Sequence, residues 1–201
     1  MKLYSTKTSP YGRLIRIIVL EKGLSDRVEN IWTETRKPDL PLYEFNPSGR
    51  VPYIRLDEGT GIENTPAITD YLDQLVSPLR FTQSANRNDW TYRSWEATAN
   101  AMLDGVSVWV REIRRPKNER SPSLIAHEKS RAERLARFFD SRISDHRFDG
   151  PLNLLQLYLY IALELEHRIS DLDWRTGNTN LVDWHARIDT LDNVRRSLVS
   201  D

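Results

Sequence analysis

The chain has 201 residues, which allows one large domain or two small ones. Hydrophobic residues make up 39% and charged residues 29% of it, and these values exclude a wholly disordered chain. Basic and acidic residues balance at 29 each, so the chain lacks the basic excess that is typical of nucleic-acid-binding proteins, and we expect no nucleic-acid partner.

The first 75 residues alternate between predicted strands and helices. Ser9-Pro10 is typical of a helix start, since serine is a favoured N-cap and proline fits the first helical position. Gly23 is typical of the residue that follows a helix. In chain order we expect a strand at Met1–Ser5, a helix that begins at Pro10 and ends before Gly23, strands at Val28–Trp32, Val51–Leu56 and near Ile62, and a helix at Pro66–Leu75. This order predicts an α/β domain of the βαβ-ββα type.

Beyond residue 77 the pattern becomes helical. Apolar residues at spacings of four and three mark one helix face: Trp95, Ala99, Met102, Val106 and Trp109. The segment Asn153–Leu165 is apolar almost all round, which is typical of a buried bundle helix, and Asn153 and Gln156 form a capping box at its start. Further helices are expected at Pro122–Ile143, Leu181–Ile188 and Asp192–Leu198. We therefore divide the chain into an α/β domain at residues 1–76, a linker at 77–88 and an all-helical domain at 89–201.

Several site types are excluded by residue content. The chain has no cysteine, which excludes disulfides, thiolate zinc sites and cysteine nucleophiles, and which fits a cytoplasmic location. Its four histidines are scattered without the spacing of metal ligands, so we expect no metal. It shows neither a signal peptide nor a run of about 18 apolar residues, so we expect no membrane association.

The tetrapeptide Ser9-Pro10-Tyr11-Gly12 directly follows the first predicted strand. A helix N-terminus offers free N–H groups and the positive end of the helix dipole, so a thiolate placed there is stabilised. The layout resembles the CPYC site of the glutaredoxin and thioredoxin fold, with both cysteines absent. The alternative interpretation is an ordinary serine N-cap followed by proline.

The segment Asn46–Pro52 reads NPSGRVP. Pro52 opens a predicted strand, where a proline removes one hydrogen-bond donor from the sheet. A cis Val51–Pro52 bond would account for it, because this geometry turns the N–H and C=O of Val51 outward to pair with an extended peptide ligand. The alternative is a trans proline in a loop.

These motifs together resemble the cytosolic glutathione transferase family over nearly the whole chain. The resemblance looks closest to bacterial members with serine at the active position, related to the theta and zeta classes. It implies a thioredoxin-like N-terminal domain, an all-helical second domain, a homodimer and glutathione as co-substrate. The segments that carry it are MKLYSTKTSPYGRLIRIIVLEKGL, NPSGRVPYIRLDEG, ENTPAITDYLD, WEATANAMLDG, GPLNLLQLYLYIALELEHRISDLDW and LVDWHARIDT.

The resemblance implies roles for single residues around glutathione. Ser9 matches the serine whose hydroxyl donates to the glutathione thiolate, with Thr8 as the neighbouring alternative. Val51 matches the residue whose backbone pairs with the cysteinyl part. Asn64 and Thr65 match the acid–serine pair that holds the γ-glutamyl end.

Five further positions complete the expected site. Arg50 and, as a weaker candidate, Lys37 match positions near the glycyl carboxylate. Asn100 matches an acid of the second domain that reaches the γ-glutamyl amine. Tyr11 and Trp109 are expected to line an apolar cleft for the electrophile.

Two of these positions depart from the family pattern, because Asn64 and Asn100 stand where carboxylates are usual. Glu63 is adjacent, but a shift of one residue changes where a side chain points. Charge-assisted hydrogen bonds are about twice as strong as neutral ones. If each replacement loses about 1 kcal/mol, the affinity for glutathione falls about 30-fold.

The sequence therefore favours a glutathione transferase, in which the thiolate of glutathione attacks a small hydrophobic electrophile held between the domains. The second hypothesis, from a different class, is a glutathione-transferase-like module that binds or regulates without catalysis. Ser9 and the Val51–Pro52 corner favour the enzyme, and the two asparagines favour the module.

Overall fold

The computed structural model describes residues 1–82 and 88–199, and the chain divides into two compact units. The first holds residues 1–85 together with the chain from residue 192 onward, and the second holds residues 86–191. The sequence had placed residues 192–201 in the helical domain, and the structure groups them with the first unit instead. Part of the predicted linker at 77–88 lies outside the described residues.

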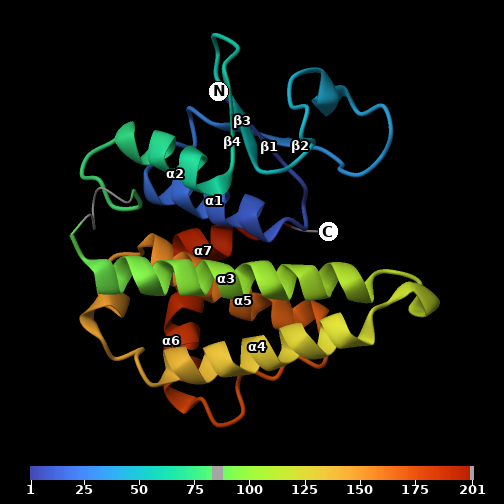
Figure 1. Ribbon diagram of the computed structural model, residues 1–201. Helices are drawn as coiled ribbons and strands as arrows, with labels where there is room; N and C mark the ends of the chain where they lie inside the picture. Colours follow the sequence, from blue (N-terminus) through green and yellow to red (C-terminus); the bar gives the residue numbers. More distant parts are fainter. Residues whose placement is uncertain (83–87, 200–201) are drawn as a thin grey trace. The chain divides into compact units, whose positions relative to one another are not determined.

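A four-stranded mixed sheet forms the centre of the first unit, in the order β2-β1-β3-β4. Its strands are β1 (Lys2–Ser5), β2 (Glu29–Trp32), β3 (Tyr53–Arg55) and β4 (Gly61–Glu63). β1 is parallel to β2, whereas β3 is antiparallel to both β1 and β4. The predicted βαβ-ββα order is confirmed (Figure 1).

The helices of the first unit are α1 (Pro10–Glu21), α2 (Thr65–Gln74) and the short α7 (Asp192–Arg196). Four apolar side chains of α1 are fully buried: Leu14, Ile15, Ile17 and Ile18. The helix ends at the C-cap Lys22, and Gly23 follows with a φ of +63°, which glycine adopts without a steric penalty. A 3₁₀ helix at Pro41–Glu44 interrupts the long loop before β3.

The second unit is helical throughout, with α3 (Trp90–Ile113), α4 (Pro122–Asp140), α5 (Leu154–Glu164) and α6 (Thr179–Asp189). α3 packs against both α4 and α5. Nearly every side chain of α5 is buried, and Asn153 and Gln156 form the predicted capping box at its start. Short 3₁₀ helices at Lys117–Glu119, His146–Phe148 and Leu165–Arg168 were not predicted. α4 ends three residues before the predicted boundary at Ile143.

Candidate functional site

Three segments of the first unit leave the sheet at the same edge (Figure 1). Tyr53 of β3 lies opposite Tyr4 of β1 on one side and opposite Glu63 of β4 on the other, and both pairs are antiparallel. The C-terminal end of β1 therefore lies beside the N-terminal end of β3, which lies beside the C-terminal end of β4. The loop into α1, the segment before β3 and the start of α2 are thus brought together by strand register alone.

Ser9 caps the N-terminus of α1. Its backbone is extended, and its Oγ accepts a hydrogen bond from the N–H of Gly12 at 3.0 Å, while Pro10 occupies the first turn. Because Oγ acts here as an acceptor, its hydrogen remains to be donated, and no acceptor for it is present among the described residues. Thr8 is exposed and does not cap the helix. The predicted N-cap is confirmed, and it leaves a hydroxyl donor at the positive end of a helix.

Gly12 makes this close arrangement possible. A Cβ on Gly12 would lie 2.9 Å from Cβ of Ser5 and 3.1 Å from Cβ of Ser9. Real Cβ atoms essentially never approach other carbon atoms to 2.9 Å. The first turn of α1 therefore sits against the end of β1 at a distance that only glycine permits.

Hydrogen bonds between its own residues stabilise the loop before β3. Asn46 is fully buried, and its Nδ2 donates to the carbonyl of Arg50 at 2.8 Å. The Ser48 Oγ accepts from the N–H of Arg50 at 3.1 Å, and Gly49 has a φ of +62°. The roles of Asn46 and Ser48 in this turn were not predicted from the NPSGR segment. Asparagine and serine are frequent in turns because their side chains form hydrogen bonds with nearby backbone groups.

The Val51–Pro52 peptide bond is cis, as predicted. β3 begins two residues later, so Val51 lies just outside the sheet. Among the described residues, neither the N–H nor the C=O of Val51 takes part in a hydrogen bond. Val51 is only half-buried, so both groups are suited to pair with an extended ligand backbone.

Asn64 lies at the junction of β4 and α2 with an unusual backbone. Its φ is +76° and its ψ is 125°, a conformation that few non-glycine residues adopt, although asparagine is one of the more tolerant. Its exposed side chain makes no capping hydrogen bond, while Thr65 begins α2 and is buried. Such conformations concentrate at functional sites. The neighbouring Glu63 accepts a short hydrogen bond from the Ser48 hydroxyl, so this carboxylate is partnered with the loop before β3.

The part of the chain that forms this edge of the sheet is similar to a known protein family. Residues 3–79 match the family model described as glutathione S-transferase, N-terminal domain. By this domain, the chain belongs to the glutathione transferase family. The match contains all three segments that meet at the sheet edge, from β1 through α2.

Curated relatives in the glutathione transferase family match part of the chain. It is 30% identical over 135 residues to an uncharacterized GST-like protein, YibF, of Escherichia coli K12, covering 67% of this chain and 65% of that protein. It is 39% identical over 115 residues to glutathione S-transferase 2 of Saccharomyces cerevisiae, covering 54% of this chain and 48% of that protein. These matches span less than two thirds of either relative.

Solved structures share the fold over the full chain. A glutathione transferase family member from Pseudomonas fluorescens Pf-5 with bound glutathione has a TM-score of 0.84 at 22% identity, covering 100% of this chain and 99% of that one. A glutathione S-transferase from Methylobacillus flagellatus KT, also with glutathione bound, has a TM-score of 0.84 at 25% identity and covers 99% of each chain. The predicted fold class, a thioredoxin-like domain followed by a helical domain, is confirmed.

The two basic candidates of the glutathione transferase site differ in their surroundings. Lys37 is exposed and forms an ion pair with Glu34 at 2.6 Å, three residues away. Arg50 is exposed, and its side chain has no partner among the described residues. Arg50 is therefore the better placed of the two to receive a carboxylate from outside, since it has no ion pair to give up.

The remaining candidates are Tyr11, Asn100 and Trp109. Tyr11 is half-buried in the first turn of α1, directly after the cap. Asn100 is half-buried on α3 of the second unit. Trp109, also on α3, is only 1% exposed, which makes it a core residue. The expected cleft roles of these three residues stay predictions, and the burial of Trp109 argues against an open position for it.

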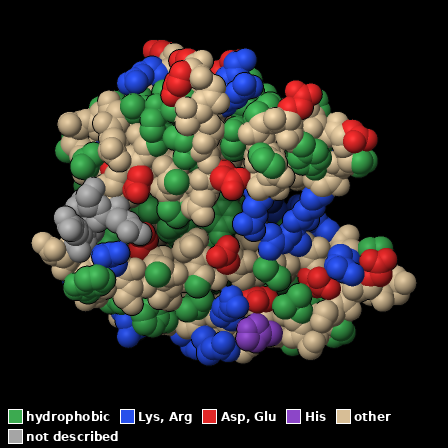
Figure 2. All heavy atoms as spheres, turned by 45° about the horizontal axis from the view of Figure 1, so that its top comes forward, with side chains coloured by type: hydrophobic (Ala, Val, Ile, Leu, Met, Phe, Trp, Pro, Cys, Tyr) green, Lys and Arg blue, Asp and Glu red, His purple; other side chains and the backbone are tan. Residues whose placement is uncertain are grey.

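Surface and metal-site properties add little to the glutathione transferase assignment. Acidic and basic side chains both occur over the face drawn in Figure 2, with hydrophobic side chains between them. Within residues 1–82 and 88–199, no group of three or more histidine, aspartate or glutamate side chains is arranged to hold a metal ion. In the same residues no helix is long and apolar enough to cross a membrane.

Proposed function

We propose that this chain is a glutathione transferase that binds glutathione in its first unit, with the thiol at the N-terminus of α1. The observation that carries the proposal is the Ser9 hydroxyl, which accepts from Gly12 and has its hydrogen left to donate. A thiolate at this position gains one hydrogen bond and the favourable end of the helix dipole.

The peptide part of glutathione fits the other groups at the sheet edge. The main-chain N–H and C=O of Val51, which have no partner in the described part of the chain, pair with the cysteinyl unit as a neighbouring strand would. Asn64 and Thr65 hold the γ-glutamyl end at the start of α2. Arg50 receives the glycyl carboxylate, with Lys37 as a second cation.

Structural relatives support a glutathione site in this fold. Two of them contain glutathione, and a third structure, from Pseudomonas fluorescens Pf-5, contains S-(propanoic acid)-glutathione. The last ligand is a conjugate of the kind that a transferase would form from an acidic electrophile. In this chain the electrophile is a small hydrophobic molecule held beside Tyr11.

Catalysis requires the protein to activate the thiol of glutathione. A free thiol has a pKa of about 8.5, and lowering it to about 6.5 requires about 2.7 kcal/mol of extra stabilisation of the thiolate. A charged hydrogen bond and a helix N-terminus supply energies of this size together. The thiolate fraction at pH 7 then rises from about 3% to about 75%, and the thiolate carries out the nucleophilic attack.

Calorimetric titration with glutathione, combined with a conjugation assay on 1-chloro-2,4-dinitrobenzene, tests the proposal. We expect saturable binding of glutathione and a conjugation rate above that of free glutathione. Absence of binding at millimolar glutathione would refute both the site and the activity.

The alternative function is a glutathione-transferase-like module without catalysis, and the neutral side chains of Asn64 and Asn100 favour it. An ammonium group that meets two amides is held less firmly than one that meets carboxylates. Glutathione binding without any lowering of the bound thiol pKa would identify the module, because binding needs only the peptide contacts.

Two further properties belong to this proposal: a homodimer and a cytoplasmic location. The family resemblance implies that, in some members, the residue at the position of Asn100 contacts glutathione bound to the other subunit. Dimer formation would then affect the glutathione site. Light scattering at micromolar concentration is expected to give twice the monomer mass, and a monomer mass would refute the dimer. Fractionation of cells that express the chain tests its location.

A further inference from the structure

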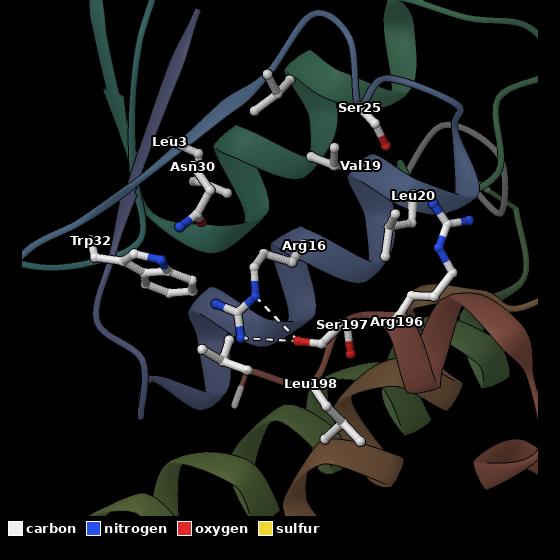
Figure 3. Close-up of a pocket in the computed structure, with 12 residues that line it drawn as sticks. Leu3, Arg16, Val19, Leu20, Ser25, Asn30, Trp32, Arg196, Ser197 and Leu198 are labelled. Atoms are coloured by element: carbon white, nitrogen blue, oxygen red, sulfur yellow. Dashed lines mark hydrogen bonds between the residues drawn. The ribbon is translucent and has the colours of Figure 1, made fainter. Parts of the chain in front are cut away.

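A cavity of about 370 Å³ lies in the first unit, apart from the proposed glutathione site (Figure 3). α1, the strands β1 and β2, and the C-terminal segment 196–199 surround it. None of the residues proposed to hold glutathione lines it. Its wall is largely apolar: Leu3, Val19, Leu20, Val28, Leu198 and Val199.

Arg16 is a cation of this wall that has no counter-ion within residues 1–82 and 88–199. The Arg16 guanidinium donates to the Ser5 Oγ at 3.3 Å and, from Nε and Nη2, to the carbonyl of Ser197 at 3.4 and 3.3 Å. All of these acceptors are neutral, and no carboxylate pairs with Arg16 among the described residues. Burial and, to a smaller extent, the nearby Arg13 cation together lower the pKa of Arg16 to about 10. Both effects disfavour the charged form of Arg16, so a carboxylate beside it would be stabilising.

Asn30 and Trp32 belong to the same wall. The Asn30 side chain accepts from Ser5 at 3.2 Å, but its buried Nδ2 has no acceptor in the described part of the chain. Trp32 is 43% exposed at the end of β2, and the Arg16 guanidinium lies 5.1 Å from its ring centroid. Figure 3 shows the Arg16, Asn30 and Trp32 side chains around the same space. The cavity therefore combines an apolar interior, an uncompensated cation and an exposed aromatic ring.

We propose that this cavity binds a small organic carboxylate with an apolar body, whose carboxylate pairs with Arg16. Arginine is the side chain best suited to hold a carboxylate, because its N–H groups match both oxygens. The volume lies within the range of small-molecule sites, and the apolar wall takes an alkyl or aryl body of about eight carbon atoms. An inorganic anion would leave this wall solvated, and a neutral apolar molecule would leave Arg16 without its counter-ion.

The site uses neither Ser9 nor Val51, although Trp32 pairs with Ser5 at the same end of the sheet. A ligand here contacts the same guanidinium that holds Ser197, so it acts on the contact between α1 and the C-terminal segment. We therefore expect octanoate to bind both in the absence and in the presence of saturating glutathione, with affinities within about threefold of each other.

Titration with four probes tests the ligand class: octanoate, 4-phenylbutyrate, octanol and acetate. The readout is the indole N–H signal of Trp32 in a ¹⁵N spectrum, assigned with the Trp32→Phe variant. We expect octanoate to shift this signal and to bind at least about 10-fold more tightly than octanol, with acetate weaker still. Comparison of octanoate with 4-phenylbutyrate distinguishes aliphatic from aromatic acids. Octanol binding as tightly as octanoate, or octanoate that leaves the Trp32 signal unmoved, would overturn the proposal.

Substitution of Arg16 tests the proposed contact. We expect Arg16→Gln to weaken octanoate binding about 10- to 100-fold and Arg16→Lys to recover part of the loss. Arg134→Gln is the matched control, because it removes one exposed arginine charge from α4 in the other unit. Unchanged octanoate affinity in Arg16→Gln, an equal loss in Arg134→Gln, or displacement of octanoate by glutathione would each contradict the proposal. The octanoate-to-octanol ratio needs no variant, so the proposal stays testable if Arg16→Gln does not fold.

Discussion

The Oγ of Ser9 accepts the N–H of Gly12 at 3.0 Å, so one atom stabilises the helix start and also offers a hydrogen to a ligand. These two roles have different consequences when Ser9 is replaced. Loss of the cap lowers the free energy of unfolding, whereas loss of the hydroxyl donor raises the pKa of a bound thiol. A substitution that keeps one role and removes the other separates them.

Ser9→Ala is expected to impair chemistry more than binding. The pKa of the thiol of bound glutathione should rise by about 1–2 units, and kcat at pH 7 should fall about 10- to 100-fold. The affinity for glutathione should change only a few-fold, because the contacts of Val51 and Asn64 remain. The loss of the cap should cost about 1 kcal/mol of stability. The pH profile of conjugation and a thermal unfolding curve measure the two effects.

Ser9→Asn and Thr8→Ala are the controls for this experiment. Asparagine is as good an N-cap as serine but has no hydroxyl, so Ser9→Asn should keep the stability and still lose the rate. Thr8→Ala should keep both. Full activity in Ser9→Ala with loss of activity in Thr8→Ala would move the thiolate donor to position 8.

Gly12→Ala is expected to damage the same site through packing. Alanine favours a helix over glycine, yet its Cβ would meet the side chains of Ser5 and Ser9 at 2.9 and 3.1 Å. We expect a net loss of about 1–3 kcal/mol in stability and a lower conjugation rate, as in other overpacked sites. A melting temperature that rises with full activity would show that Ser5 and Ser9 can move apart.

Asn64→Asp is expected to strengthen glutathione binding. The φ of +76° at position 64 is tolerated by aspartate about as well as by asparagine, so the backbone need not change. A carboxylate there would form a charge-assisted hydrogen bond with the γ-glutamyl ammonium and raise the affinity about 3- to 10-fold. Calorimetry against glutathione measures the gain.

A glutathione analogue without the γ-glutamyl ammonium should show no gain with Asn64→Asp, which ties the effect to that group. Asn118→Asp in the second unit is the matched control for an added negative charge on an exposed residue. An equal gain in Asn118→Asp, or no gain in Asn64→Asp, would mean that position 64 does not contact the ammonium.

Local signals in the sequence predicted much of the fold and the frame of the site. Four of these signals depend on a few neighbouring residues, and all four are confirmed: the Ser9 cap, Gly23 after the C-terminus of α1, the Asn153 capping box and the cis bond before Pro52. Backbone preferences at helix ends and before proline act over short distances, so a single sequence carries them.

Features that depend on distant segments were not predicted. Arg16 donates to the carbonyl of Ser197, 181 residues later, and nothing in either local sequence indicates that pairing. The grouping of residues 192–199 with the first unit is of the same kind. Trp109 follows a helical apolar pattern that fits both a cleft and a core, and the local sequence does not distinguish the two.

Lys22 and Asp73 form a buried ion pair that supports the last prediction. The Lys22 Nζ lies 2.8 Å from Oδ1 of Asp73, and the other carboxylate oxygen accepts from the N–H groups of Arg80, Phe81 and Thr82 at 2.8 to 2.9 Å. Burial alone would raise the pKa of Asp73, but the hydrogen bonds from Lys22 and the three N–H groups outweigh it and hold this pKa below its usual value. The carboxylate therefore connects the end of α1 to the chain that follows α2.

Asp73→Asn should lower the stability of the first unit by about 3–5 kcal/mol at pH 7, because it leaves the Lys22 ammonium buried without a counter-ion. The sign of the pH dependence follows from the lowered pKa of Asp73. The carboxylate stabilises the folded state fully above the unfolded pKa of about 3.9, and this contribution is lost as the pH falls through the lower folded pKa. Urea unfolding between pH 3 and pH 7 should thus show a gap between wild type and variant that narrows only below about pH 4. Asp26→Asn, an exposed carboxylate of the same unit, should show no such gap, and a difference that is constant across this range would contradict the assignment.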